Sequence, residues 1–444
     1  MAKIGFVSLG CAKNQVNTEQ MIYLLQQAGY EILPDPDGAD VAVVNTCGFI
    51  DSAKSEAIDN ILALGELKAA GRIGKILVAG CLSQRYQEEI LREMPEVDGI
   101  LGCGSYFSIV PAVEQVLEER QPVFLEDIDA PIPEVPRTLT TPEHYAYLKI
   151  AEGCDNRCSY CVIPSLRGRY RSRTMEDLLE EARDLAAAGV RELIVVAQDI
   201  SRYGLDLYGE RRLPELLRQL CRIEGFRWIR LHYLYPDEVT EELIDTVASE
   251  PKILKYLDIP IQHVNDVILK RMNRRGTKAE LEALLTTLRE RIPGLVLRTS
   301  LIAGLPGEGE AEFEELCDFL RRWKLERVGC FAFSPEEGTP AAQMEYPDAE
   351  IARERADLVT ELQSRVMDDF NERRIGTREI VLCEGYDEER GAYFGRSYAE
   401  SPDIDGCIWF TDHRELQPGR FVEIEITDAV DGELIGVSID DDSE

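Results

Sequence analysis

The feature that most constrains this sequence is a regular alternation between short apolar runs and amphipathic segments with helical spacing. Near the start, the amphipathic segments cover about residues 17–28 and 52–70. The apolar runs around them are residues 4–9, 41–44, 76–79 and 99–101. This pattern predicts a parallel β-sheet with helices on its faces.

The alternation resumes after residue 142 and continues to about residue 333. Its apolar runs are residues 147–151, 192–197, 228–233, 256–260, 296–303 and 327–333. Six such repeats, separated by amphipathic helices, predict a barrel or partial barrel of the βα type.

The remaining segments suggest domain boundaries for a mixed α/β chain. Residues 121–142, rich in Pro and Thr, are expected to be a linker between an α/β domain at 1–120 and the barrel at 143–374. Residues 375–444 have short apolar runs with Gly at the turns, which predicts a small all-β domain.

Twelve cysteines occur in a sequence with no pattern typical of a signal peptide or a membrane span. We therefore expect a soluble, cytoplasmic protein whose thiols stay reduced. Under those conditions the cysteine spacing indicates metal ligation more than disulfide bonding.

Three cysteines, Cys154, Cys158 and Cys161, have the spacing C-x3-C-x2-C directly after a predicted strand. Three thiolates can hold an iron-sulfur cluster and leave its fourth iron open to another ligand. A structural zinc site is the alternative, but it needs a fourth Cys or His nearby, and the next cysteine is Cys221.

Cys11, Cys47 and Cys81 each end a different predicted strand of the first domain. Because the carboxyl ends of parallel strands share one edge, these thiols could meet on one metal centre. Three buried cysteines at strand ends are an equally good interpretation, since Cys103 also follows a strand.

The segments Ser-Leu-Gly-Cys11-Ala-Lys-Asn, Asn-Thr-Cys47-Gly and Gly-Cys81-Leu-Ser-Gln-Arg, together with the spaced triad, resemble the radical SAM methylthiotransferase family. The resemblance implies two 4Fe-4S clusters. Cys154, Cys158 and Cys161 would hold the one that binds S-adenosylmethionine (SAM). Cys11, Cys47 and Cys81 would hold an auxiliary one that carries sulfur. It also implies a C-terminal TRAM domain.

The resemblance further implies that SAM lies near Gln198, Gly304 and Gly307, in segments after the second and fifth barrel strands. No catalytic side chain is assigned beyond the cluster ligands. Arg167, which begins a run of alternating arginines, could hold a carboxylate or lie on a solvated loop.

Members of this family modify either an adenosine in transfer RNA or an aspartate in ribosomal protein twelve of the small subunit. Residues 375–444 contain no Lys and carry 5 basic and 19 acidic residues. Such a domain should repel RNA and attract a basic ribosomal protein, so we expect methylthiolation of the aspartate β-carbon.

Two alternatives remain, a transfer RNA methylthiotransferase and a non-catalytic metal-binding scaffold. An electron donor such as flavodoxin or ferredoxin is expected as a second partner.

Overall fold

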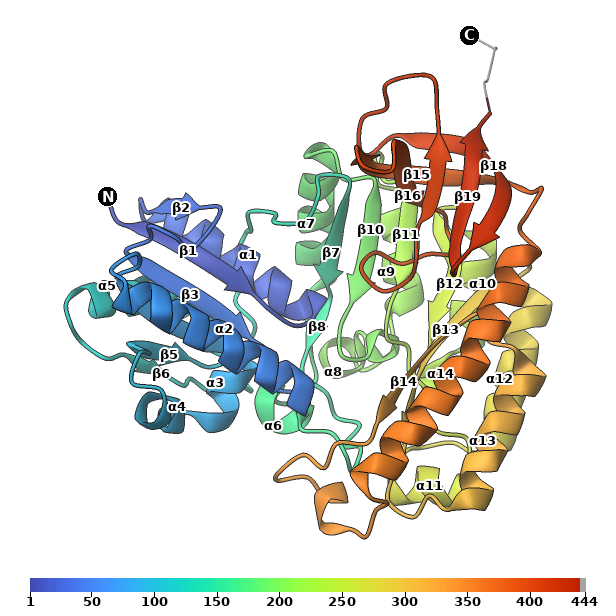
Figure 1. Cartoon of the computed structure of the whole chain (residues 1–444), viewed down its shortest axis with the longest axis horizontal. Helices are drawn as coiled ribbons and strands as arrows, with labels where there is room; N and C mark the ends of the chain where they lie inside the picture. Colours follow the sequence, from blue (N-terminus) through green and yellow to red (C-terminus); the bar gives the residue numbers. More distant parts are fainter. Residues whose placement is uncertain (440–444) are drawn as a thin grey trace.

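The computed structural model describes residues 1–439, and its parts follow one another along the sequence: an α/β part, a larger α/β part and a small β-barrel (Figure 1). The predicted fold class is confirmed. Within residues 1–439, no helix is long and apolar enough to cross a membrane.

The first part is a six-stranded sheet in the order β2-β1-β3-β4-β5-β6, with every neighbouring pair parallel. Its strands are β1 (Lys3–Ser8), β2 (Glu31–Leu33), β3 (Val41–Thr46), β4 (Lys75–Gly80), β5 (Gly99–Leu101) and β6 (Val123–Phe124). The two edge strands, β2 and β6, were not predicted. β6 lies in the segment expected to be a linker.

Helices cover both faces of this sheet. They are α1 (Ala12–Gln27), α2 (Asp51–Ala69), α3 (Cys81–Tyr86), α4 (Glu88–Glu93) and α5 (Ile109–Leu117). Each face has its own apolar core, and the strand β3 between them is buried throughout. Burial on both faces explains why this strand reads as a continuous apolar run instead of an alternating one.

The second part contains all six strands expected for a partial barrel, in the open order β14-β13-β12-β11-β10-β7. The strands are β7 (Tyr145–Lys149), β10 (Glu192–Val196), β11 (Trp228–Leu231), β12 (Ile253–Asp258), β13 (Val296–Ala303) and β14 (Arg327–Ala332). A separate antiparallel pair, β8 (Ala151–Glu152) and β9 (Arg171–Ser172), borders the cysteine loop. The helices are α6 (Ile163–Arg167), α7 (Met175–Ala187), α8 (Leu205–Tyr208), α9 (Leu213–Cys221), α10 (Glu241–Ser249), α11 (Asp266–Arg271), α12 (Lys278–Arg291), α13 (Glu310–Trp323) and α14 (Ala349–Glu372).

The two α/β parts meet where α1 packs against the inner face of the open barrel. Val16 of α1 shares an apolar cluster with Tyr145 and Tyr147 of β7 and with Ile194 and Val196 of β10. An incomplete barrel exposes one side of its interior, and here a helix of the first part covers it.

The C-terminal part is a closed barrel in the order β15-β16-β17-β19-β18, which confirms the expected small all-β domain. Its strands are β15 (Arg378–Asp387), β16 (Ala392–Arg396), β17 (Ile408–Thr411), β18 (Phe421–Val430) and β19 (Glu433–Ser438). In β18, Val422, Ile424 and Ile426 face the core while Glu423 and Glu425 are exposed. This alternation places acidic side chains on the outer surface of the barrel.

The segment between the first two parts is tied down by ion pairs. Arg137 contacts Glu19 of α1 at 2.6 Å and Glu181 of α7 at 2.7 Å, with its side chain almost fully buried. The segment therefore fastens the first part to the second instead of acting as a loose connection.

A buried carboxylate joins the second part to the C-terminal barrel. Glu192 at the start of β10 accepts from Arg230 at 2.6 Å and from Arg396 of β16 at 2.8 Å, and all three side chains are buried. Burial alone would raise the pKa of Glu192, but Arg396 and Arg230 lower it to about 2.

We predict that Glu192→Gln lowers the free energy of unfolding by about 3 kcal/mol at pH 7, because two buried guanidinium groups lose their counterion. The folded-state pKa lies below the unfolded value of about 4.3, so the difference is full above about pH 4.5 and shrinks as the pH falls towards 2. Urea unfolding at several pH values measures this stability difference for Glu192→Gln and for the exposed control Glu180→Gln, each relative to wild type. Equal stability of wild type and Glu192→Gln at pH 7 would contradict it.

Candidate metal centres

The structure places Cys11, Cys47 and Cys81 at the carboxyl ends of three adjacent strands. Cys11 follows β1 and lies just before α1, Cys47 directly follows β3, and Cys81 directly follows β4 and begins α3. Because β1, β3 and β4 are neighbours in a parallel sheet, the three loops leave the same edge. Cys47 is close enough to both other thiols to interact with them electrostatically.

Two glycines allow these loops to approach one another. Gly10 has a φ of 88°, and a Cβ at this position would lie 2.7 Å from the Cβ of Cys47. A Cβ on Gly48 would lie 3.0 Å from the backbone of Cys81 and Leu82. Any larger side chain at either position would push the cysteine loops apart.

The three thiols of Cys11, Cys47 and Cys81 lie in an environment that disfavours negative charge unless a metal supplies positive charge. Burial, followed by the nearby Cys81 and Cys11, raises the pKa of the Cys47 thiol to about 12. A neutral thiol is therefore stable here until a metal displaces its proton, as thiolate ligation requires. The donor set of three converging cysteines fits an iron-sulfur cluster with one open iron.

The second triad lies on the loop between β8 and α6, and barrel segments hold that loop in place. The Cys154 amide donates to the carbonyl of Gly168 at 3.1 Å. Ser159 is fixed through its amide, which donates to the Met272 carbonyl at 2.9 Å, and through its hydroxyl, which donates to the Arg271 carbonyl at 3.0 Å. The C-x3-C-x2-C loop thus has a defined shape.

Burial raises the pKa of Cys154 to about 11 and that of Cys161 further. Arg274 lies beside this triad, with its guanidinium 3.7 Å from the sulfur of Cys158 and 3.2 Å from the hydroxyl of Tyr160. This donor set also fits a cluster, since a nearby cation offsets the charge of the thiolates.

Among residues 1–439, no three Cys, His, Asp or Glu side chains lie close enough together to ligate a single metal ion. A four-iron cluster binds each thiolate to a different iron, so its ligands stand farther apart than those of one zinc ion.

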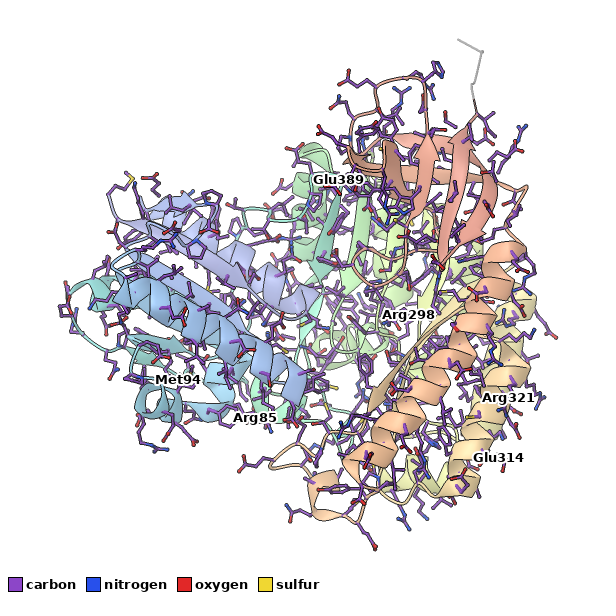
Figure 2. The ribbon with its side chains drawn as sticks, viewed as in Figure 1. Arg85, Met94, Arg298, Glu314, Arg321 and Glu389 are labelled. Atoms are coloured by element: carbon purple, nitrogen blue, oxygen red, sulfur yellow. The ribbon has the colours of Figure 1, made fainter. Side chains whose placement is uncertain are left out.

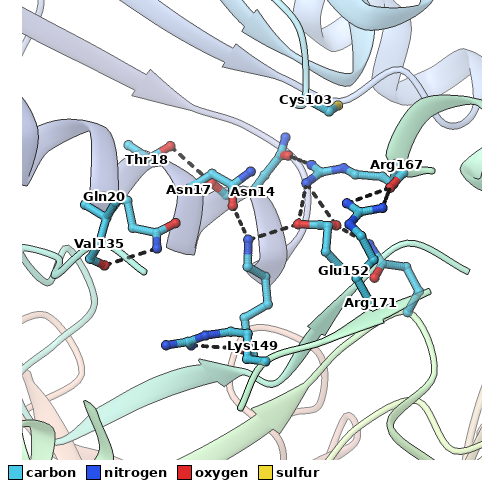
Figure 3. A network of polar contacts seen from close by, with 12 residues as sticks. Asn14, Asn17, Thr18, Gln20, Cys103, Val135, Lys149, Glu152, Arg167 and Arg171 are labelled. Atoms are coloured by element: carbon cyan, nitrogen blue, oxygen red, sulfur yellow. Dashed lines mark hydrogen bonds and ion pairs between the residues drawn. The ribbon is translucent and has the colours of Figure 1, made fainter. Parts of the chain in front are cut away.

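A buried polar network extends from Glu152, near the second triad, to Arg167, which contacts the first triad, and Figure 3 shows its central residues. Glu152, two residues before Cys154, accepts from Lys149 at 2.9 Å and from Arg167 at 3.3 Å. Lys149 also donates to Asn17, and Arg167 donates to Asn14, so both cations reach α1 of the first part. The opposing effects of burial and of these cations leave the pKa of Glu152 well below its usual value.

Arg167 also contacts a member of the first triad directly. Its guanidinium lies 3.4 Å from the sulfur of Cys81. The thiol of Cys103, which was noted in the sequence only because it also follows a strand, donates to the same sulfur at 3.7 Å. The hydrogen bond from Cys103 and the charge of Arg167 outweigh burial and lower the pKa of Cys81. Of the two interpretations of Arg167, the solvated loop is wrong, because its side chain is 2% exposed.

The three residues expected near SAM have packing roles of their own. Gln198 donates to Glu152 at 2.9 Å. Gly304 and Gly307 both have positive φ, and a Cβ there would lie 2.3 Å from Ala352 of α14 and 2.0 Å from Arg271 respectively. Contact of these residues with SAM stays a prediction.

Sequence reasoning missed the residues that join the domains. Lys149 and Glu152 lie within or beside a segment that reads as an apolar strand, and only their spacing of three residues hints at a pair. Arg85 of α3, at the edge of the first part nearest the barrel (Figure 2), donates to Glu336 at 2.7 Å across 251 residues of sequence. No local pattern could predict such a contact.

Three family models match successive parts of the chain. Residues 3–102 match the model described as "Uncharacterized protein family UPF0004", residues 148–320 match the radical SAM superfamily, and residues 375–439 match the TRAM domain.

Curated relatives are similar over almost the whole length. The ribosomal protein uS12 methylthiotransferase RimO of Caldanaerobacter subterraneus subsp. tengcongensis is 46% identical, and the alignment covers 98% of this chain and 100% of that protein. The RimO of Pelotomaculum thermopropionicum is 48% identical, with coverage of 98% and 99%.

Solved structures share the fold at low sequence identity. The radical SAM methyltransferase TsrM from Kitasatospora setae, with tryptophan and a SAM analogue bound, gives a TM-score of 0.58 at 14% identity, covering 87% of this chain and 79% of that one. The cobalamin-dependent enzyme OxsB gives 0.53 at 14% identity, with coverage of 82% and 56%.

We predict that Glu152→Gln destabilises the metal-free protein by about 3 kcal/mol, because Lys149 and Arg167 are then buried without a counterion. The double variant with Glu152→Gln and Lys149→Met should be more stable than Glu152→Gln alone, because it contains one unpaired cation fewer. Urea unfolding of the two single variants and the double variant measures the coupling. Additive effects of the two substitutions would show that the charges act independently.

Proposed function

The chain belongs to the family of ribosomal protein uS12 methylthiotransferases called RimO, and we propose that it adds a methylthio group to the β-carbon of an aspartate in ribosomal protein uS12. The enzyme is a radical SAM transferase that uses two 4Fe-4S clusters and SAM. The observation that carries the proposal is a pair of cysteine triads on two different domains, connected by one buried network.

We assign the auxiliary cluster to Cys11, Cys47 and Cys81 and the SAM-binding cluster to Cys154, Cys158 and Cys161. With both clusters and SAM bound, SAM would supply a deoxyadenosyl radical for hydrogen abstraction, and the auxiliary cluster would supply the sulfur for transfer. The protein's own part is to hold the two triads in a fixed relative position. Arg167 does so most directly, because it pairs with Glu152 beside Cys154 and also contacts the sulfur of Cys81.

SAM itself is assigned to the barrel mouth near Gln198, Gly304 and Gly307. The amide oxygen of Gln198 is buried and has no hydrogen-bond partner among residues 1–439. An unsatisfied buried acceptor is costly, so a bound ligand with a donor would stabilise it. The amide nitrogen is already fixed by Glu152, which orients this oxygen.

The charge of the C-terminal barrel supports uS12 as the substrate over transfer RNA. Residues 375–444 contain no Lys, and the outward side chains of β18 include Glu423 and Glu425. Ribosomal proteins that bind RNA are basic, so an acidic face attracts them. RNA binding would instead require Lys and Arg side chains that neutralise its phosphates. We propose no RNA binding, a low-potential electron donor such as flavodoxin or ferredoxin, and action in the cytoplasm, where thiols stay reduced.

We predict that anaerobically reconstituted wild-type protein holds about eight iron atoms per chain, as two four-iron clusters require. Alanine at Cys11, Cys47 and Cys81 should reduce this to about four, and so should alanine at Cys154, Cys158 and Cys161. Iron and sulfide analysis measures it. A triple alanine variant of Cys221, Cys330 and Cys407 is the matched control and should keep the full amount. Unchanged iron in the Cys11, Cys47 and Cys81 variant would remove the auxiliary site.

The proposed reaction is tested by mass spectrometry of uS12 and of transfer RNA, each incubated anaerobically with reconstituted enzyme, SAM and a low-potential reductant. We expect a methylthio gain on an aspartate of uS12 and none on the RNA. A gain on the RNA alone would keep the chemistry and refute the proposed substrate.

A further inference from the structure

A lysine without an acidic partner among residues 1–439 lies beside the first triad. Lys13 is in the first turn of α1, two residues after Cys11, and its ammonium is 3.9 Å from the centre of the Tyr233 ring. The first turn of α1 contains no acidic residue, and the helix has no side-chain cap. A helix N-terminus is already electropositive, so a lysine there adds positive charge where it is least favourable for the helix alone.

The charges around Lys13 come from both α/β parts. It interacts electrostatically with Tyr233, Cys11, Arg167 and Glu152, and it acts in turn on Asp258 at the end of β12. Lys13 and Cys11 lie in the first part, and the other residues of this group lie in the second part.

The two carboxylates that interact electrostatically with Lys13 are each paired with another cation. Glu152 pairs with Lys149 and Arg167. Asp258 pairs with Arg298 at 2.9 Å. Within residues 1–439, no hydrogen bond or ion pair engages the Lys13 ammonium, so its charge is left for a ligand.

Tyr233 supports this cation in an unusual backbone conformation. Its φ is 67°, a left-handed value that is rare for a bulky aromatic residue. Such strain persists only where surrounding structure imposes it, and it gathers at functional sites. The ring contacts one side of the ammonium, and a cation on a ring face keeps N–H groups available for an anion. The Tyr233 hydroxyl likewise has no hydrogen-bond partner among the described residues.

We propose that Lys13, supported by Tyr233, binds the side-chain carboxylate of the substrate aspartate and so places its β-carbon between the two triads. The inference rests on the proposed function and adds the residue that recognises the substrate. The carboxylate carbon is bonded directly to the β-carbon, so a charge-assisted hydrogen bond to a carboxylate oxygen holds a group only two bonds from the reacting atom. A neutral nucleobase would gain nothing from this contact.

The test compares binding of two forms of uS12, with the target aspartate intact or changed to Asn, to SAM-loaded holoenzyme without reductant. Wild-type enzyme should bind the aspartate form about tenfold or more tightly, as a charged hydrogen bond allows. Lys13→Met removes the charge but keeps a side chain of similar length that can pack against the Tyr233 ring. This variant enzyme should bind both forms equally. Lys13→Arg keeps the charge and should keep much of the preference.

Lys3→Met is the matched control, because Lys3 lies at the opposite end of β1 and is exposed. It should discriminate as wild type does. A Lys13→Met enzyme that still prefers the aspartate form would overturn the inference, and so would a wild-type enzyme that binds both forms equally yet methylthiolates uS12. Absence of uS12 binding and modification by wild type would refute the proposed function and this inference together. The two failures are therefore distinguishable.

Discussion

The structure depends on one buried carboxylate, Glu152, which pairs with two cations that both reach into the first domain. A buried carboxylate is expensive to desolvate, and it stabilises a fold only when its partners are present and well placed. Glu152 and both cations belong to the second part, and Lys149 also donates to Asn17 and Arg167 to Asn14, so the hydrogen bonds of the two cations are complete only when α1 is docked on the open barrel. Domain docking therefore completes the hydrogen bonding of a charge cluster that lies within the second part.

This dependence has a consequence for chemistry shared between two domains. Under the assignment proposed above, sulfur held on one domain meets a substrate radical generated on the other, and small misplacements lower such rates strongly. A mainly polar interface would normally allow the domains to move. The apolar contact of Val16 with the open barrel face and the ion pairs of Arg137 oppose that motion at points distant from Glu152.

The sequence predicted the elements better than their connections. All six barrel strands and the parallel order of the first sheet follow from periodicity, because strands buried on both faces read as apolar runs. β2 and β6 were missed, since edge strands of two or three residues have no period to detect. The three cysteines at strand ends could be grouped by topology, but Arg167 and Cys103 were not linked to Cys81, because contacts across domains leave no trace in local spacing.

Most of the few basic residues of the C-terminal barrel are paired with acidic residues. Of its five arginines, Arg396 is buried against Glu192 and Glu384, Arg390 pairs with Glu433, and Arg414 pairs with Asp412. Only Arg378 and Arg420 lack an acidic partner within residues 1–439. RNA binding needs several cations placed against phosphates. The three paired arginines instead stabilise the C-terminal barrel itself or its contact with the second part. The outer surface of the C-terminal barrel is therefore mainly acidic, as a binding site for a basic protein requires. This charge supports a protein substrate independently of the catalytic core.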